Sequence, residues 1–177
     1  MTTIEPVPLL DVIVEAPQWE TTRGAETTVR GALTEAAIAT GIDFKDRTLA
    51  VLLTDDAAIR RLNAQWRGVD KPTNVLSFPP ASSAGKEFGA VKSLGDIAIA
   101  YETTAREAVE EHKPLDHHLA HLAVHGFLHL LGYDHDTESA ATTMEQFERV
   151  ILARLGVPDP YLTHEPDAPH ALHEARS

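Results

Sequence analysis

Three histidines in the second half of the chain have a spacing suited to one metal ion. They are His125, His129 and His135, in the segment HGFLHLLGYDH. On a helix that turns about 100° per residue, His125 and His129 share one face, one turn apart. Gly132 can adopt the left-handed backbone conformation that ends a helix, so His135 can return to the same ion from the side. The pattern therefore predicts a metal site made of three imidazoles.

This spacing is also the zinc-ligand pattern of the metzincin proteases, in which glutamate follows the first histidine. Here that position holds Gly126. In zinc peptidases the glutamate activates water and passes a proton to the leaving amine, and glycine can do neither. We find no convincing replacement elsewhere in the chain. Phosphodiester cleavage depends less on that proton, because electrostatic stabilisation of added negative charge lowers more of its barrier.

The expected ion is Zn²⁺, one per chain. The sequence contains no cysteine, which excludes disulfides and leaves imidazole and carboxylate groups as metal ligands. Three protein ligands leave a fourth position open for water or substrate, as in catalytic zinc sites. A structural zinc site has four protein ligands.

Other histidines lie on the same predicted helix. His121 is one turn before His125, and His118 is on nearly the same face. Each could orient a ligand, replace one, or be a polar position at the mouth of the site, and we favour the last role. His112 and His117 are expected to face solvent. The tail histidines could scavenge metal, but we favour a solvated tail: His164, His170 and His173.

A group of positive residues lies upstream of the histidines. Between residues 60 and 71 the chain has four cations against Asp70 alone, although its formal net charge is −12. Arg60 and Arg61 are expected to complement the C-terminal end of a helix. The net charge argues against binding nucleic acid over the whole surface, so an anionic substrate requires a local basic patch.

The segment that follows is rich in hydrogen-bond donors. Arg67 precedes a glycine turn, and the loop continues through Lys71, Thr73 and Asn74. Guanidinium, ammonium, hydroxyl and amide groups suit phosphate oxygens. We predict that Arg67 is a catalytic phosphate clamp and that all four residues bind substrate.

The composition is typical of a soluble globular protein. The chain has 177 residues, of which 43% are hydrophobic and 24% are charged, and this length favours one domain. We assign residues 1–156 to that domain and residues 157–177 to a proline-rich tail, extended or disordered. The start of the chain has no secretory signal, and no apolar run approaches the roughly 20 residues that span a bilayer. We therefore expect a cytoplasmic protein.

Hydrophobic periodicity predicts an α+β fold with a mixed sheet of about four strands packed with helices. The expected strands are residues 9–15, 47–54, 74–78 and 95–100. The expected helices are residues 24–40, 55–66, 101–112, 116–131 and 138–155. Residues 81–93 are expected to form a mobile loop. The last helix is expected to bury one side, formed by Met144, Phe147, Val150, Ile151 and Leu155.

Three segments together resemble the YbeY family of bacterial rRNA maturation factors, which are regarded as metal-dependent endoribonucleases. The segments are HGFLHLLGYDH (125–135), LNAQWRGVDKPTNVLSFP (62–79) and LGDIAIA (94–100). Their order and spacing also match, so the resemblance covers about residues 7–155.

The resemblance implies a compact α+β domain with a metzincin-like zinc site at His125, His129 and His135. It also implies that Arg67 is important in a basic cleft. The implied tasks are processing of the 16S rRNA 3′ end and ribosome quality control, with the small ribosomal subunit as partner. Many family members have aspartate at the position of Asn74, so we assign no proton transfer to Asn74.

The leading hypothesis is a single-strand-specific endoribonuclease acting on rRNA, with zinc as Lewis acid and activator of water. Asp134 is either a partner of the ligand His135, a proton acceptor, or a turn residue, and we favour the turn. The nucleophile, metal-bound water or the RNA 2′-hydroxyl, stays open. One alternative is a non-catalytic ribosome assembly factor with a structural zinc. Another is a metallohydrolase acting on peptides or small substrates. Ribosome-associated proteins could recruit such an acidic chain.

Overall fold

The computed structural model describes residues 9–80 and 92–162. Most of the mobile loop predicted at residues 81–93 lies outside the described residues, and residues 92 and 93 belong to a strand instead. The tail histidines His164, His170 and His173 also lie outside the described part.

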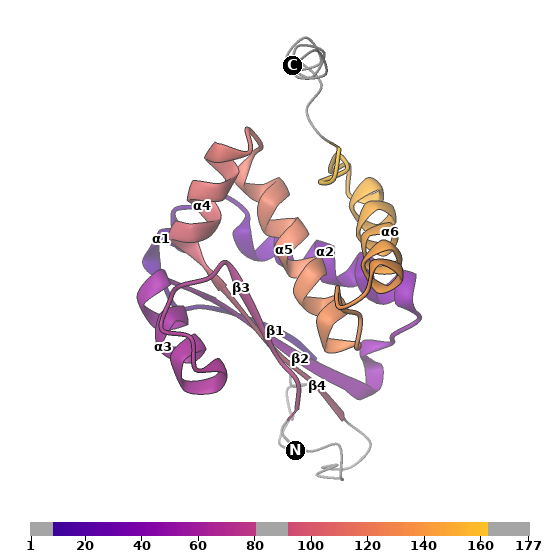
Figure 1. Ribbon diagram of the computed structural model, residues 1–177, viewed down its shortest axis with the longest axis horizontal. Helices are drawn as coiled ribbons and strands as arrows, with labels where there is room; N and C mark the ends of the chain where they lie inside the picture. The colour runs from indigo at the N-terminus through magenta and orange to yellow at the C-terminus, as the bar shows by residue number, and fades with distance from the viewer. Residues whose placement is uncertain (1–8, 81–91, 163–177) are drawn as a thin grey trace, which may run out of the picture.

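A mixed sheet of four strands in the order β1-β2-β4-β3 forms the centre of the molecule (Figure 1). The strands are β1 (Leu10–Val14), β2 (Arg47–Thr54), β3 (Val75–Phe78) and β4 (Lys92–Ala100). β1, β2 and β4 run parallel, and β3 pairs antiparallel with β4. The mostly apolar β2 is interior, as strands buried on both faces usually are. The predicted α+β class and mixed four-stranded sheet are confirmed.

Helices cover both faces of this sheet (Figure 1). The helices are α1 (Pro17–Glu20), α2 (Ala25–Thr40), α3 (Asp56–Arg67), α4 (Tyr101–Glu110), α5 (Leu115–Leu130) and α6 (Glu138–Arg154). The α2, α5 and α6 helices form the main core with one face, while α3 packs on the other. Residues of β4 alternate accordingly, with Ile97 and Ile99 in the main core and Ala98 and Ala100 facing α3. This is the period of two expected of a strand.

Local sequence signals explain several helix ends. The carboxylate of Asp55 accepts a hydrogen bond from the amide of Ala58 at 2.8 Å and thereby caps α3. Gly41 ends α2 with a φ of 74°. Two short elements were not predicted, α1 and a 3₁₀ turn at Phe44–Asp46. No helix of residues 9–80 and 92–162 has the length and apolar character needed to cross a membrane.

The turn between α5 and α6 positions the third histidine. Gly132 has a φ of 96°, and the amide of Tyr133 donates to the carbonyl of Leu128 at 3.1 Å, which closes the end of α5. Thr137 caps α6 by accepting a hydrogen bond from the amide of Ala140 at 3.0 Å. Both ends of the short turn are fixed, so His135 is held beside α5. This is the chain reversal predicted from Gly132.

One face of α6 differs from the prediction. Val150 was expected to be buried but is 51% exposed, whereas Glu148 is completely buried. Glu148 lies four residues after Met144 and three before Ile151, so it shares their face of the helix. Val150 is two residues further along and points away from that face. A carboxylate therefore enters the core where sequence patterning placed only apolar groups.

Candidate metal centre

The structure brings the three predicted ligands together. The Nε2 atoms of His125 and His129 are 3.0 Å apart. The ring of His135 stacks on that of His125 at 5.0 Å between centroids, and it lies 5.3 Å from the ring of His129. One nitrogen from each ring lies within 4.8 Å of the other two.

This donor set fits one zinc ion. Two nitrogens bound tetrahedrally at about 2.0 Å from zinc are roughly 3.3 Å apart, close to the separation of the two Nε2 atoms. His125 and His129 are half-buried and His135 is exposed, so the cluster opens toward solvent. Within the described residues, the group contains three side chains and no fourth, which is the composition of an open zinc site.

Gly126 is a packing position that faces the sheet. A Cβ atom at this residue would lie 3.1 Å from Cγ2 of Ile97 and 3.2 Å from Cγ2 of Val75. The same Cβ would be 3.2 Å from the hydroxyl oxygen of Ser77, which donates to the carbonyl of Gly126 at 2.8 Å. A glutamate side chain at this position would enter β3 and β4 and would not reach the histidines. The missing glutamate therefore reflects the close approach of α5 to the sheet.

Glu148 holds the ring of His125, the first of the predicted ligands. Its Oε1 atom accepts from Nδ1 of His125 at 2.8 Å, and its Oε2 atom accepts from Nε2 of His121 at 2.7 Å. The hydroxyl of Tyr161 also donates to Oε2. With its Nδ1 proton held by Glu148, His125 presents Nε2 to the cluster.

The charge states of this network follow from its contacts. Burial alone raises the pKa of Glu148, but hydrogen bonds from His121, His125 and Tyr161 outweigh burial and lower that pKa to about 2. Burial, and then the neighbouring Glu148 carboxylate, raise the pKa of the Tyr161 phenol well above its usual range. Glu148 is therefore an acceptor and Tyr161 a donor. Burial first, and then the nearby His125 and His135, lower the pKa of His129, which favours the neutral form that binds metal.

A second group of potential ligands consists of His121, His125 and Glu148. Both oxygens of Glu148 already accept hydrogen bonds, and Nε2 of His121 is one of the donors. Metal binding at this group would break those bonds. The group of His125, His129 and His135 is the better candidate, because no carboxylate lies between its facing nitrogens.

Two residues of this network were missed from the sequence. Glu148 had a usable signal, since a charged residue in register with Met144 and Ile151 on an apolar helix face must find a buried partner. Tyr161 had none, because it falls in the proline-rich stretch assigned to the tail. For His121 the favoured role was a polar position at the mouth of the site, with partner of a ligand as an alternative. The structure places it in the wall of the cavity beside α5 and on Glu148.

His118 and Asp134 have local partners. His118 is only 4% exposed, and its Nε2 atom lies 2.9 Å from the carboxylate of Glu107. It lines the cavity that also contains His121 and His125 in its wall. Burial, opposed by Glu107, lowers the pKa of His118. The carboxylate of Asp134 accepts from the amide of Asp136 at 3.1 Å, which is a turn contact.

A cavity of about 250 Å³ runs along α5 beside the histidines and contains Asn74. The lining residues include Asn74, Glu107, Lys113, His121, His125 and Tyr161. The amide nitrogen of Asn74 donates to Glu107 at 2.9 Å, and its oxygen accepts from the amide of Val75 at 2.7 Å. One amide hydrogen of Asn74 stays available to a ligand. Among the predicted substrate-binding residues, Asn74 thus lines the same cavity as His125, a predicted metal ligand.

The other predicted phosphate-binding residues lie around the end of α3. Arg67 is the last residue of this helix, and it is exposed, as is Lys71, while Thr73 is half-buried. In the described part of the chain, Arg67 makes no ion pair. Asn63 donates to the carbonyl of Lys71 at 2.9 Å and fixes the loop. Within the described residues, no hydrogen bond or ion pair joins Arg67, Lys71 or Thr73 to the histidines.

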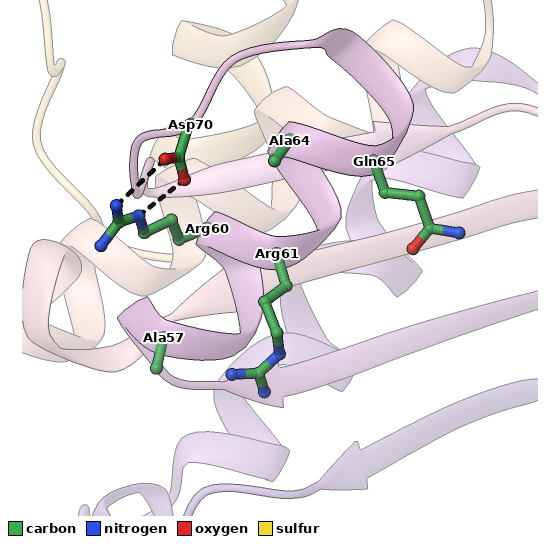
Figure 2. Close-up of a pocket in the computed structure, with 6 residues that line it drawn as sticks. All are labelled: Ala57, Arg60, Arg61, Ala64, Gln65 and Asp70. Atoms are coloured by element: carbon green, nitrogen blue, oxygen red, sulfur yellow. Dashed lines mark hydrogen bonds and ion pairs between the residues drawn. The ribbon is translucent and has the colours of Figure 1, made fainter.

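An open groove of about 620 Å³ lies on the outer face of α3 (Figure 2). Arg60 forms a two-bond ion pair with Asp70 at 2.8 and 3.1 Å. Figure 2 shows Arg61 extending separately from this pair. Asp70, the single acid of the segment, is therefore occupied by Arg60, and the charges of Arg61 and Arg67 are not compensated by it.

Comparison with known proteins matches residues 14–156 to the family described as Endoribonuclease YbeY. The chain belongs to the YbeY family. A relative from Nitrobacter hamburgensis named Endoribonuclease YbeY is 56% identical over 161 residues, covering 90% of this chain and 85% of the relative. A relative from Rhodopseudomonas palustris, also named Endoribonuclease YbeY, is 59% identical over 154 residues. The match covers 87% of this chain and 81% of that relative.

A solved structure shares the fold described above. The solution structure of TM1509 from Thermotoga maritima superposes with a TM-score of 0.52 at 21% sequence identity. The match covers 87% of this chain and 99% of that protein. At this identity the likeness supports the fold alone.

Proposed function

We propose that this chain is a single-strand-specific, metal-dependent endoribonuclease that acts in rRNA maturation. The proposed tasks are processing of the 16S rRNA 3′ end and ribosome quality control. The observation that carries the proposal is the open cluster of three histidines in a chain whose relatives, at 56% and 59% identity, are named Endoribonuclease YbeY. The small ribosomal subunit is the proposed partner, and ribosome-associated proteins could recruit this acidic chain. We place the protein in the cytoplasm, where that substrate is made.

His125, His129 and His135 are the proposed ligands of one Zn²⁺ per chain. When bound, zinc supplies Lewis-acid stabilisation of negative charge and lowers the pKa of a nearby water molecule. Glu148 holds the proton on Nδ1 of His125 and so keeps Nε2 free to bind. The sheet-facing position of Gly126 leaves no carboxylate at the site of the peptidase glutamate, which disfavours peptide hydrolysis.

RNA binding is proposed for Arg67, Lys71, Thr73 and Asn74. Arg67 is exposed and unpaired within the described residues, so its guanidinium can bind two phosphate oxygens as a clamp. Lys71 adds a second charge and Thr73 a hydroxyl donor, while Asn74 adds an amide donor in the wall of the cavity beside α5. Asp134 is proposed to hold the turn that presents His135.

A paired digestion of RNA tests the function. Wild type and His129→Ala are incubated with a labelled single-stranded precursor of the 16S rRNA 3′ end, with and without a chelator. His117→Ala is the matched control, since His117 lies on the same helix and makes no side-chain hydrogen bond in the described structure. We expect cleavage by wild type and the control only, abolished by the chelator and restored by zinc. Equal cleavage by His129→Ala, or none by any folded protein, would favour the non-catalytic assembly factor.

A further inference from the structure

The residues just after α6 return to the metal centre. The amide of Val157 donates to the carbonyl of Leu152 at 2.9 Å, which turns the chain back along α6. Asp159 forms an ion pair with Arg149 at 3.0 Å and also accepts from the amide of Tyr161 at 2.8 Å. A single carboxylate thus ties this turn to α6. All of the turn lies beyond residue 156, where the match to the family ends.

Tyr161 is held on three sides. Its hydroxyl donates to Oε2 of Glu148, and its ring meets the ring of His121 edge to face at 5.7 Å. The guanidinium of Arg149 lies over the tyrosine ring, 5.4 Å from its centroid. The side chain is half-buried and forms part of the wall of the cavity beside α5.

The tyrosine completes the set of donors around a buried charge. Glu148 is fully buried, and its two oxygens accept from His125, His121 and Tyr161. Removing the phenol hydroxyl would leave Oε2 with His121 as its remaining donor. The carboxylate could then rotate or admit water from the cavity, and the bond between Oε1 and His125 would loosen with it.

We propose that Tyr161 is a positioning residue of the metal centre, acting through Glu148 to fix the orientation of His125. The inference rests on the metal site of the proposed function and not on RNA cleavage. It assigns a role in metal affinity to a segment that the YbeY family match does not cover. Tyr161 itself does not reach the ion and is not a catalytic residue.

Titration of the full-length protein with Co²⁺ tests this role, because the visible absorption of Co²⁺ reports the geometry of its ligands. Tyr161→Phe removes the hydroxyl and keeps the ring against His121 and Arg149. Tyr101→Phe is the matched control, since the ring of Tyr101 packs on Trp19 away from the histidines. His129→Ala identifies the part of the signal that comes from the proposed site.

We expect Tyr161→Phe to weaken Co²⁺ binding about tenfold, the lower end of the range for groups that orient metal ligands, with a changed absorption spectrum. Tyr101→Phe should bind as wild type does. Asp159→Asn, which removes the charge that pairs with Arg149, should shift the affinity in the same direction. An affinity and a spectrum for Tyr161→Phe equal to wild type would overturn the inference.

The proposed function can fail separately. One possible outcome is that wild type binds Co²⁺, His129→Ala does not, and neither protein cleaves RNA. This outcome would refute the nuclease and leave the role of Tyr161 in place. Binding by wild type that persists in His129→Ala would overturn both, because the ion would then be held elsewhere.

Discussion

The hydroxyl of Ser77 on β3 donates to the carbonyl of Gly126 on α5 at 2.8 Å, and this contact joins the edge strand to the helix that carries His125 and His129. Three atoms would lie within 3.2 Å of a Cβ atom on Gly126. The glycine therefore allows α5 to approach the sheet. It also explains why a metzincin-like histidine pattern lacks its glutamate.

Gly126→Ala should lower the free energy of unfolding by about 1 kcal/mol, because crowding against β3 and β4 exceeds the gain in helix propensity. Gly31→Ala is the matched control in α2, where a Cβ would meet nothing within 4 Å. The control should raise the free energy of unfolding by up to about 1 kcal/mol. Urea unfolding measures both variants. Equal stabilisation by the two would refute close packing at Gly126.

Gly126→Glu completes the peptidase motif in sequence and should produce no peptidase. The new carboxylate would face Ile97 and Val75 in the interior of the protein, so we expect a loss of stability of several kcal/mol, on the order of 3. Peptide hydrolysis, measured on a fluorogenic peptide library with the zinc-loaded protein, should stay at background. A zinc-dependent signal above that of the wild type would show that position 126 faces the metal.

Glu148→Gln should weaken zinc binding by about 10- to 100-fold, because the amide orients His125 less strongly than the carboxylate does. Glu138→Gln is the control, since Glu138 is exposed in the first turn of the same helix. Competition with a chromophoric chelator gives both affinities. Unchanged affinity in Glu148→Gln would show that the buried carboxylate does not orient the ligand.

The stability of the metal-free protein should fall in acid through Glu148. Its pKa is about 2 in the folded protein against an ordinary value of 4.5, so the unfolded chain binds the proton first. The contribution of the Glu148 carboxylate to the free energy of unfolding is complete above pH 4.5 and disappears as the pH falls toward 2. This lowering of the pKa corresponds to roughly 3 kcal/mol. The stability difference between wild type and Glu148→Gln, measured by urea unfolding, should shrink over that interval. A stability difference between the two proteins that stays constant or grows would contradict the lowered pKa of Glu148.

Arg67→Ala should weaken binding of single-stranded RNA about tenfold or more, since a charged hydrogen bond contributes roughly 1.5 kcal/mol or more. The slope of log affinity against log salt concentration should decrease by about 0.7 for the lost phosphate contact. Zinc affinity should not change. Arg60→Ala is the control on the same helix, because Asp70 already pairs with Arg60. Fluorescence anisotropy across a salt series measures both variants, and an unchanged slope for Arg67→Ala would exclude the phosphate clamp.

Periodicity in the sequence was sufficient to predict the sheet and the larger helices. The strand at residues 47–54 and the helix that ends at Gly41 follow from apolar runs and a glycine stop, which act over a few neighbouring residues. The three histidines could likewise be grouped, because a helix and a glycine turn bring them together locally. Such features need no knowledge of distant contacts.

Long-range contacts could not be predicted in this way. Glu148 is 23 residues from His125 in sequence, and Tyr161 is 13 residues from Glu148. Their meeting depends on how α6 packs against α5, which hydrophobic patterning does not specify. The orientation of Gly126 toward β3 could not be predicted either, because it also depends on packing between distant segments. The absence of the glutamate could be interpreted only after the strand that faces Gly126 was known.

Zinc titration of the metal-free protein, with cleavage of the labelled 16S rRNA 3′ precursor as the readout, tests the central claim most directly. We predict no cleavage without metal and a rise that levels off at one Zn²⁺ per chain, with no rise in His129→Ala. Cleavage by the metal-free protein as fast as by the zinc-loaded protein would contradict a metal centre that is required for the reaction.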